Sequence, residues 1–195
     1  MERRSGQPLR LAVNLSARQF RQNDLVEMVA DALAVSGLPA AQLELEITEG
    51  ALMVDTDETQ ARLKALRALG VSIAIDDFGV GFSSLSYVTR FDIDTLKIDR
   101  SFIAALPASA SDAAVARTVI ALGQALGIKV VAEGVENDAQ LAFLRGHRCD
   151  LAQGARFGMP TEPSSFSVQG FHFAAALSPD DFVAALPTLA AATRV

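Results

Sequence analysis

Residues 73–84 read Ile-Ala-Ile-Asp-Asp-Phe-Gly-Val-Gly-Phe-Ser-Ser, a short apolar run that ends in two adjacent carboxylates and a Gly-x-Gly turn. An apolar run of this length before a glycine turn predicts a strand that is buried on both faces. Asp76 and Asp77 at its end are costly there unless a cation or a cluster of donors balances their charge. The economical interpretation is a divalent metal site at the mouth of a parallel sheet, where α/β folds place their functional sites.

Strand-like and helix-like segments alternate along the rest of the chain. Short apolar or alternating runs predict strands at 9–15, 42–48, 72–75, 95–98, 128–132 and 149–153. Helical spacing predicts helices at 24–36 and 56–69, which end at Gly37 and Gly70, and a short helix after the Gly-x-Gly turn.

Capping residues mark the later helices. Ser111 or Asp112 is expected to cap a long helix that ends at Gly127. Asn137 and Gln140 have the spacing of a capping box for a helix to Leu144, and residues 178–181, Ser-Pro-Asp-Asp, open a C-terminal helix.

Repeated strand–helix units with short loops predict a parallel sheet in one domain, 1–195, which is either open and doubly wound or closed into a barrel. Polar residues at nearly every strand end favour the (β/α) barrel, because side chains from so many strands converge only when the sheet closes. They are Asn14, Glu46, Asp76, Lys97, Glu133 and Gln153. Barrels of this kind typically have about 250 residues, so this chain of 195 is short by about one unit.

Composition excludes several classes of function. A net charge of −6 without a basic run argues against a nucleic-acid polymer as the main partner. No stretch approaches the apolar length of a membrane span, and the first residues lack the apolar region of a signal peptide. The single Cys149 suits a reducing compartment, so a cytoplasmic location is expected.

Five strand-end residues form an all-oxygen set of candidate metal ligands: Asn14, Glu46, Asp76, Asp77 and Glu133. Hard oxygen ligands suit Mg²⁺ or Mn²⁺ rather than zinc, and two such ions together can promote phosphodiester cleavage. Lys97 would add a donor for water or a phosphoryl oxygen. The turn at Gly79 is expected to bring Asp76 and Asp77 to one site, and residues 79–84 to form a mobile loop whose backbone donors reach Glu49.

Each residue also has an ordinary structural interpretation. An Asp-Asp pair before a glycine turn is often a cap or an Asx turn. Glu46 and Glu49 alternate as surface carboxylates do, and Lys97 is spaced to snorkel or to pair with Asp99. The joint occurrence of these residues at strand ends favours the functional interpretation.

Six segments carry a resemblance to one known family: 13–16 (Val-Asn-Leu-Ser), 45–49 (Leu-Glu-Ile-Thr-Glu), 76–85 (Asp-Asp-Phe-Gly-Val-Gly-Phe-Ser-Ser-Leu), 96–99 (Leu-Lys-Ile-Asp), 131–136 (Val-Ala-Glu-Gly-Val-Glu) and 153–154 (Gln-Gly). Over about residues 9–154 the chain resembles EAL-domain cyclic di-GMP phosphodiesterases. The resemblance implies a TIM-like barrel that linearises cyclic di-GMP to pGpG with two Mg²⁺ or Mn²⁺ ions.

The resemblance also implies a role for each matching residue. It makes Asn14, Glu46, Asp76, Asp77 and Glu133 metal ligands, with Asp76 bridging the two ions. It further implies that Lys97, Asp77 and Glu133 are catalytic residues, with Lys97 next to the catalytic water. Gln153 would be a substrate-binding residue that lines the site, and Glu49 would be the anchor of the loop after Asp77.

The chain departs from the family at both ends. Only thirteen residues precede Asn14, so we expect the first strand and helix, with its Glu-x-Leu motif, to be absent. Residues 155–195 form a divergent closing segment, in which Gln169-Gly170 repeats Gln153-Gly154. Two hypotheses follow: a phosphodiesterase, impaired or whole, and a catalytically inactive module that binds cyclic di-GMP or a protein partner. The family implies either a homodimer or an upstream sensor or GGDEF domain as partner.

Overall fold

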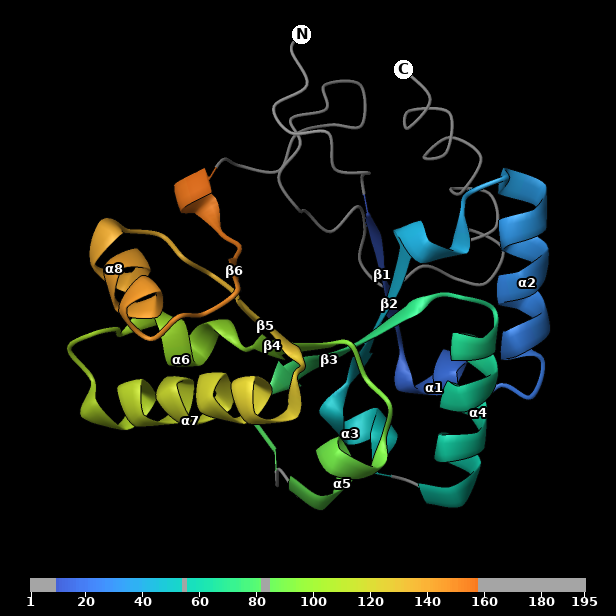
Figure 1. Cartoon of the computed structure of the whole chain (residues 1–195), viewed down its shortest axis with the longest axis horizontal. Coiled ribbons are helices and arrows are strands. Elements are labelled where there is room, and N and C mark those ends of the chain that lie inside the picture. Colours follow the sequence, from blue (N-terminus) through green and yellow to red (C-terminus); the bar gives the residue numbers. More distant parts are fainter. Residues whose placement is uncertain (1–9, 54–55, 82–84, 158–195) are drawn as a thin grey trace, which may run out of the picture.

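A computed structural model describes residues 10–53, 56–81 and 85–157 of the chain (Figure 1). All six strands of these residues lie in one parallel sheet, in the order β1-β2-β3-β4-β5-β6. The strands are β1 (Leu11–Leu15), β2 (Leu43–Thr48), β3 (Ser72–Phe78), β4 (Thr95–Ile98), β5 (Lys129–Ala132) and β6 (Leu151–Ala152). Strand order that follows chain order is typical of a (β/α) barrel, whereas a doubly wound sheet reverses direction. The predicted α/β fold of TIM-barrel type is therefore confirmed.

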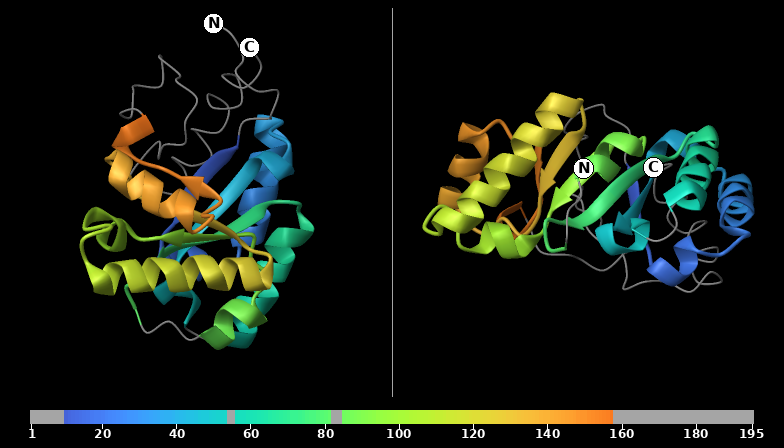
Figure 2. Two further views of the ribbon diagram at one scale, coloured as in Figure 1. Left: turned by 60° about the vertical axis from the view of Figure 1, so that its left-hand side comes forward. Right: turned by 90° about the horizontal axis from the view of Figure 1, so that it is seen from below.

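Helices follow the strands and cover the sheet (Figures 1 and 2). They are α1 (Ala17–Phe20), α2 (Leu25–Ser36), α3 (Glu49–Leu52), α4 (Thr56–Ala68), α5 (Leu85–Arg90), α6 (Arg100–Ala104), α7 (Ala110–Leu126) and α8 (Asp138–Gly146), with 3-10 turns at Ala40–Gln42 and Ala155–Phe157. Helix α4 packs on α2 and β3, and α7 packs on α6, β4 and β5. One helix pair, α2 and α4, thus lies near the first strands of the sheet, and another, α6 and α7, lies on β4 and β5.

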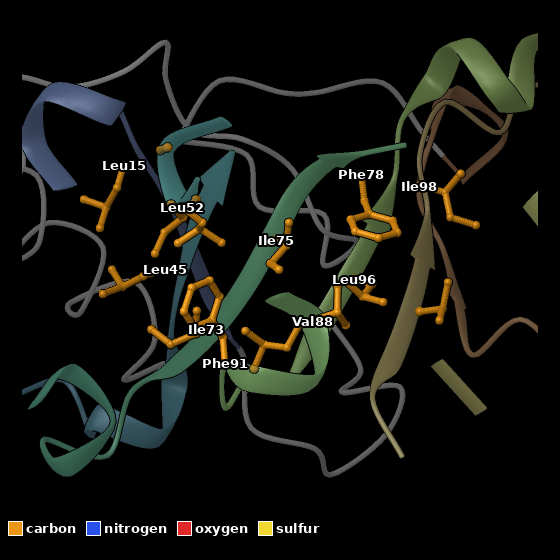
Figure 3. Close-up of a cluster of buried hydrophobic side chains, with 14 of the residues drawn as sticks. Leu15, Leu45, Leu52, Ile73, Ile75, Phe78, Val88, Phe91, Leu96 and Ile98 are labelled. Atoms are coloured by element: carbon orange, nitrogen blue, oxygen red, sulfur yellow. The ribbon is translucent and has the colours of Figure 1, made fainter. Parts of the chain in front are cut away.

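The two faces of the sheet differ in chemistry because side chains alternate along each strand. One face is apolar and packs into the main hydrophobic core, in which Figure 3 shows Leu45, Ile73, Ile75 and Leu96. Residues at the intervening positions include polar side chains that are also buried, among them Glu46, Asp76, Thr95 and Lys97. The strand with the Asp pair is therefore buried on both faces up to Asp76, as predicted, but only one of its faces is apolar.

The helix ends largely match the predictions. Gly37 and Gly127 end α2 and α7 with left-handed φ values of 66° and 70°. Asn137 and Gln140 form both hydrogen bonds of the predicted capping box. The predicted cap of α7 is wrong, because Ser109, two residues before Ser111, accepts the hydrogen bond from the Asp112 amide.

Strand β3 is longer than predicted, because it continues past Ile75 to Phe78. A register shift lies between Ile75 and Phe78, and beyond it Phe78 pairs with Ile98 of β4. The expected C-terminal helix, the second Gln-Gly segment and residues 82–84 of the loop lie outside the described residues.

Candidate functional site

Lys97 lies at the centre of the polar face, with only 2% of its side chain exposed. Its Nζ lies 2.8 Å from Glu46 Oε1, 3.2 Å from Asp76 Oδ1 and 2.6 Å from Glu133 Oε1. These partners come from β2, β3 and the segment after β5, so four consecutive strands supply one cluster. The structure thus brings together four of the residues that the sequence analysis selected.

The charges of this cluster depend on one another. Burial by itself lowers the pKa of an ammonium group, but the charges of Glu46, Glu133 and Asp76 outweigh it and raise the pKa of Lys97 above its ordinary value. The ammonium therefore stays charged at neutral pH. Two ordinary interpretations are wrong: Lys97 does not snorkel to the surface, and Glu46 and Glu49, with 4% and 6% exposed, are not surface carboxylates.

Asp77 lies at the edge of this cluster and is exposed. Its backbone has a φ of 54°, in the left-handed region that few residues other than glycine adopt. Burial raises the pKa of the Asp77 carboxyl, and the charges of Asp76, Asp99 and Glu133 raise it further. The chain therefore already turns at Asp77, two residues before Gly79, and this backbone conformation sets the direction of the Asp77 side chain relative to that of Asp76.

Asp99 is a neighbour of this site that the sequence analysis considered only as an ion-pair partner of Lys97. Its carboxylate accepts a hydrogen bond from the Ser101 amide at 2.9 Å and so caps α6, and it also adjoins Asp77. The described ion pairs of Lys97 involve other carboxylates. The spacing Asp99-x-Ser101, typical of an N-cap, was the signal in the sequence.

Asn14 and Gln153 lie toward opposite edges of the sheet. Asn14 on β1 is paired in register with Glu46 on β2, so both residues belong to the polar face. Gln153 follows β6, where its amide donates to Ala132 O at 2.8 Å and its carbonyl accepts from Val135 N at 3.0 Å. Those bonds join the segment after β6 to the segment that carries Glu133.

Glu49 reaches the turn after the Asp pair. Its Oε2 accepts a hydrogen bond from the Gly79 amide at 3.2 Å. Gly79 has a φ of 101°, and a Cβ there would lie 3.1 Å from the ring of Phe102. A glycine at 79 therefore suits both the backbone conformation and the close approach of α6.

The donor set suits a hard cation chemically, because Glu46, Asp76 and Glu133 already direct carboxylate oxygens at one positive charge. Across 10–53, 56–81 and 85–157, no three His, Cys, Asp or Glu side chains are grouped as a metal site. In the same residues, no helix is long and apolar enough to cross a membrane.

The fold and the polar face define a class of protein: a parallel α/β barrel domain with a carboxylate cluster at strand ends. The model of the EAL domain matches residues 1–160, and the chain belongs to the EAL-domain family. The prediction of this family from the sequence is confirmed.

Two curated relatives from Pseudomonas aeruginosa are similar in sequence. The chain is 53% identical over 152 residues to the cyclic di-GMP phosphodiesterase NbdA, and 47% identical over 150 residues to the bifunctional diguanylate cyclase/cyclic di-GMP phosphodiesterase MucR. These matches cover 78% and 77% of the chain but only 19% and 22% of the relatives. The chain thus spans about a fifth of the length of either relative.

Solved structures resemble the chain over a similar region. The phosphodiesterase of P. aeruginosa MucR in complex with c-di-GMP is 46% identical with a TM-score of 0.75, covering 77% of this chain and 61% of that one. Klebsiella pneumoniae BlrP1, in a manganese/cy-diGMP complex, is 37% identical with a TM-score of 0.72, covering 77% of this chain and 39% of that one. These neighbours therefore bind c-di-GMP, and one of them contains manganese.

Proposed function

We propose that this chain is a cyclic di-GMP phosphodiesterase domain that hydrolyses its substrate to linear pGpG. The observation that carries the proposal is the convergence of Glu46, Asp76 and Glu133 on one buried cationic centre at strand ends. The identity of 53% to a named cyclic di-GMP phosphodiesterase supports the substrate. In the reaction, one water attacks one phosphodiester and one P–O ester bond breaks.

Five residues would hold the metal ions, Mg²⁺ or Mn²⁺: Asn14, Glu46, Asp76, Asp77 and Glu133. When bound, two such ions supply the positive charge that a phosphodiester needs among carboxylates, and they activate water for attack. Their donors are all oxygens, which fits both cations. The manganese in the K. pneumoniae neighbour supports the choice of cation.

Three further residues would orient the reactants. Lys97 holds its ammonium toward the carboxylates, where it can donate to the attacking water or to a phosphoryl oxygen. Gln153 is fixed next to the Glu133 segment by two backbone hydrogen bonds, which suits a residue that lines the substrate site. Glu49 would hold the turn at Gly79 through the hydrogen bond described above.

The test is conversion of cyclic di-GMP to pGpG by the 195-residue chain, with Mg²⁺ or Mn²⁺ and with chelator. We expect metal-dependent turnover that Asp76→Asn abolishes, because the substitution removes a charged ligand. Asp31→Asn, an exposed change on α2, is the matched control and should leave turnover unchanged.

Absence of turnover at millimolar Mn²⁺ in folded protein would overturn the proposal. Stabilisation by cyclic di-GMP without turnover would instead indicate the inactive binding module. We further propose that the domain works beside a sensor or GGDEF partner, which the greater length of the relatives supports. The alternative, which rests on the family resemblance alone, is a homodimer.

A further inference from the structure

The segment from Glu133 to Asn137 carries a proposed metal ligand, and three contacts tie it to its surroundings. The Glu133 amide donates to Ile98 O at 3.1 Å, at the end of β4. Gly134, with a φ of 72°, lies so close to α6 that a Cβ there would be 2.7 Å from Arg100 Cβ. Val135 N donates to Gln153 O at 3.0 Å. The position of the Glu133 backbone thus depends on how this segment sits against β4, α6 and the segment after β6.

Gln140 on α8 adds a fourth contact from inside the protein. Its side chain belongs to the capping box but is only 1% exposed, which is unusual for a cap. Its Oε1 accepts from the amides of Glu136 at 2.7 Å and Asn137 at 3.1 Å. Its Nε2 donates to Ala104 O, at the C-terminal end of α6, at 3.1 Å. The side chain therefore bridges the Glu133 segment and α6.

Strand β4, which carries Lys97, ends at Ile98. The cap residue Asp99 follows it, and helix α6 starts at Arg100. Gly134 touches the first turn of α6, and Gln140 binds its last residue. Helix α6 is thus held to the Glu133 segment at both of its ends, in addition to the direct pairing of β4 with β5 and the hydrogen bond from Glu133 N to Ile98 O. All these contacts act on the backbone of the Glu133 segment, and Glu133 Oε1 lies 2.6 Å from Lys97 Nζ.

We propose that Gln140 and Gly134 are positioning residues, which hold Glu133 through α6 in the geometry needed to bind the divalent cation. The inference rests on the proposed function. Outer-shell contacts of this kind orient ligands, and their loss typically lowers metal affinity about 10- to 100-fold.

The test compares two variants with two matched controls in the 195-residue chain. Gln140→Met removes the bridge, and Asn137→Ala, its control, removes the helix cap but leaves the contacts of Gln140 Oε1 and Nε2. Gly134→Ala forces α6 away, and Gly127→Ala is its control. Gly127 has nearly the same φ, 70°, but nothing lies within 4 Å of an added Cβ. Both controls therefore carry the local loss of stability, from a lost cap or a strained backbone, but leave the contacts to α6 unchanged.

The readout is the melting temperature as Mn²⁺ is titrated, with turnover of cyclic di-GMP measured separately. We expect Gln140→Met and Gly134→Ala to raise the Mn²⁺ concentration for half-maximal stabilisation by about tenfold. The controls should lower the metal-free melting temperature but leave that concentration unchanged. If one of the two variants does not fold, the other still decides.

Two results would overturn the inference. If the unsubstituted chain responds to Mn²⁺ and all four variants respond at the same concentration, the positioning role is wrong, whereas the proposed function stands. If the unsubstituted chain neither responds to Mn²⁺ nor turns over cyclic di-GMP, both the metal site and the positioning role fail.

Discussion

Lys97 Nζ lies 2.6 Å from Glu133 Oε1, and this pair is the shortest of three contacts between one buried ammonium and the carboxylates of the site. A buried carboxylate is stable only when it is paired or when it loses its charge. In the protein without metal, Lys97 therefore supplies the positive charge that keeps three carboxylates together. A divalent cation would compete with it for the same oxygens.

Replacing Lys97 by methionine should make stability depend on metal. Without Mn²⁺, Lys97→Met should lose about 3 kcal/mol of unfolding free energy, because three carboxylates then lose their contact with the buried ammonium charge. With Mn²⁺, part of that loss should be recovered, and the metal-induced stabilisation should exceed that of the unsubstituted chain. Urea unfolding with and without Mn²⁺ measures both. Lys64→Met, on the exposed side of α4, is the control. If Lys97→Met lost the same unfolding free energy with and without Mn²⁺, the competition between Lys97 and the metal would be contradicted.

Asp77 should destabilise the metal-free protein at neutral pH. Its raised pKa means that the folded state holds the proton more tightly than the unfolded state. Its contribution to stability is thus present below the unfolded pKa and is lost as pH rises through the folded pKa. Asp77→Asn should therefore raise stability at pH 7 by less than about 1 kcal/mol, since the group is largely exposed.

Asparagine suits this test, because it tolerates the left-handed backbone that Asp77 adopts. The gain should disappear near pH 3, where the aspartate is protonated in both states. Chemical unfolding with chelator at both pH values measures the difference. A gain of the same size at pH 3, or a gain from the exposed control Asp31→Asn, would show that charge at position 77 is not the cause.

The Glu49 carboxylate should matter through the turn that it holds. Glu49→Ala leaves the Gly79 amide without its 3.2 Å acceptor, which should cost about 1–3 kcal/mol. Glu49→Gln keeps an oxygen acceptor and should cost less than half as much. The melting temperature and the turnover of cyclic di-GMP should both fall further in Glu49→Ala than in Glu49→Gln. Equal effects of the two substitutions would mean that the charge, and not the hydrogen bond, is what the turn needs.

Much of the fold follows from local sequence signals. Apolar runs, the glycines after α2 and α7 and the Asn137–Gln140 box each act within a few residues, so they are visible without the structure. The convergence of Glu46, Asp76 and Lys97 also follows, because parallel strands put their carboxyl ends at one edge. These features were predicted for that reason.

Other features depend on contacts between distant residues. The extension of β3 requires Phe78 to pair with Ile98, twenty residues away in the sequence (98 − 78), and no local pattern indicates it. The cap of α7 was ambiguous because Ser109, Ser111 and Asp112 are all suitable caps. The second role of Gln140, its bond to Ala104 O, joins residues 36 apart. Only the packing of α8 against α6 selects it.

Cys149 should be a poorly reactive thiol in the folded protein. Burial raises the pKa of the Cys149 thiol to about 11, while Sγ lies 3.3 Å from Leu151 O. Because the thiolate is the reactive species, a thiol reagent at pH 8 should label folded protein about 100-fold more slowly than protein unfolded in urea. The native rate should rise as pH increases from 9 to 11. Equal rates in the two states at pH 8 would contradict the burial of this group.

Gly154 should not tolerate a side chain, because it lies directly against the segment of Glu133. A Cβ at this position would be 2.3 Å from both the N and the O of Val135, which are backbone atoms and cannot move aside. Gly154→Ala should therefore cost about 3 kcal/mol and break the Val135–Gln153 hydrogen bond.

Gly146→Ala is the matched control, because nothing lies within 4 Å of an added Cβ at the last residue of α8. Alanine favours a helix over glycine, so this control should be neutral or gain up to about 1 kcal/mol. Urea unfolding of both variants measures the contrast. Because the clash would push Gln153 away from Glu133, Gly154→Ala should also lower turnover of cyclic di-GMP by more than its loss of folded protein explains. A stable, fully active Gly154→Ala protein would mean that the two segments need not touch.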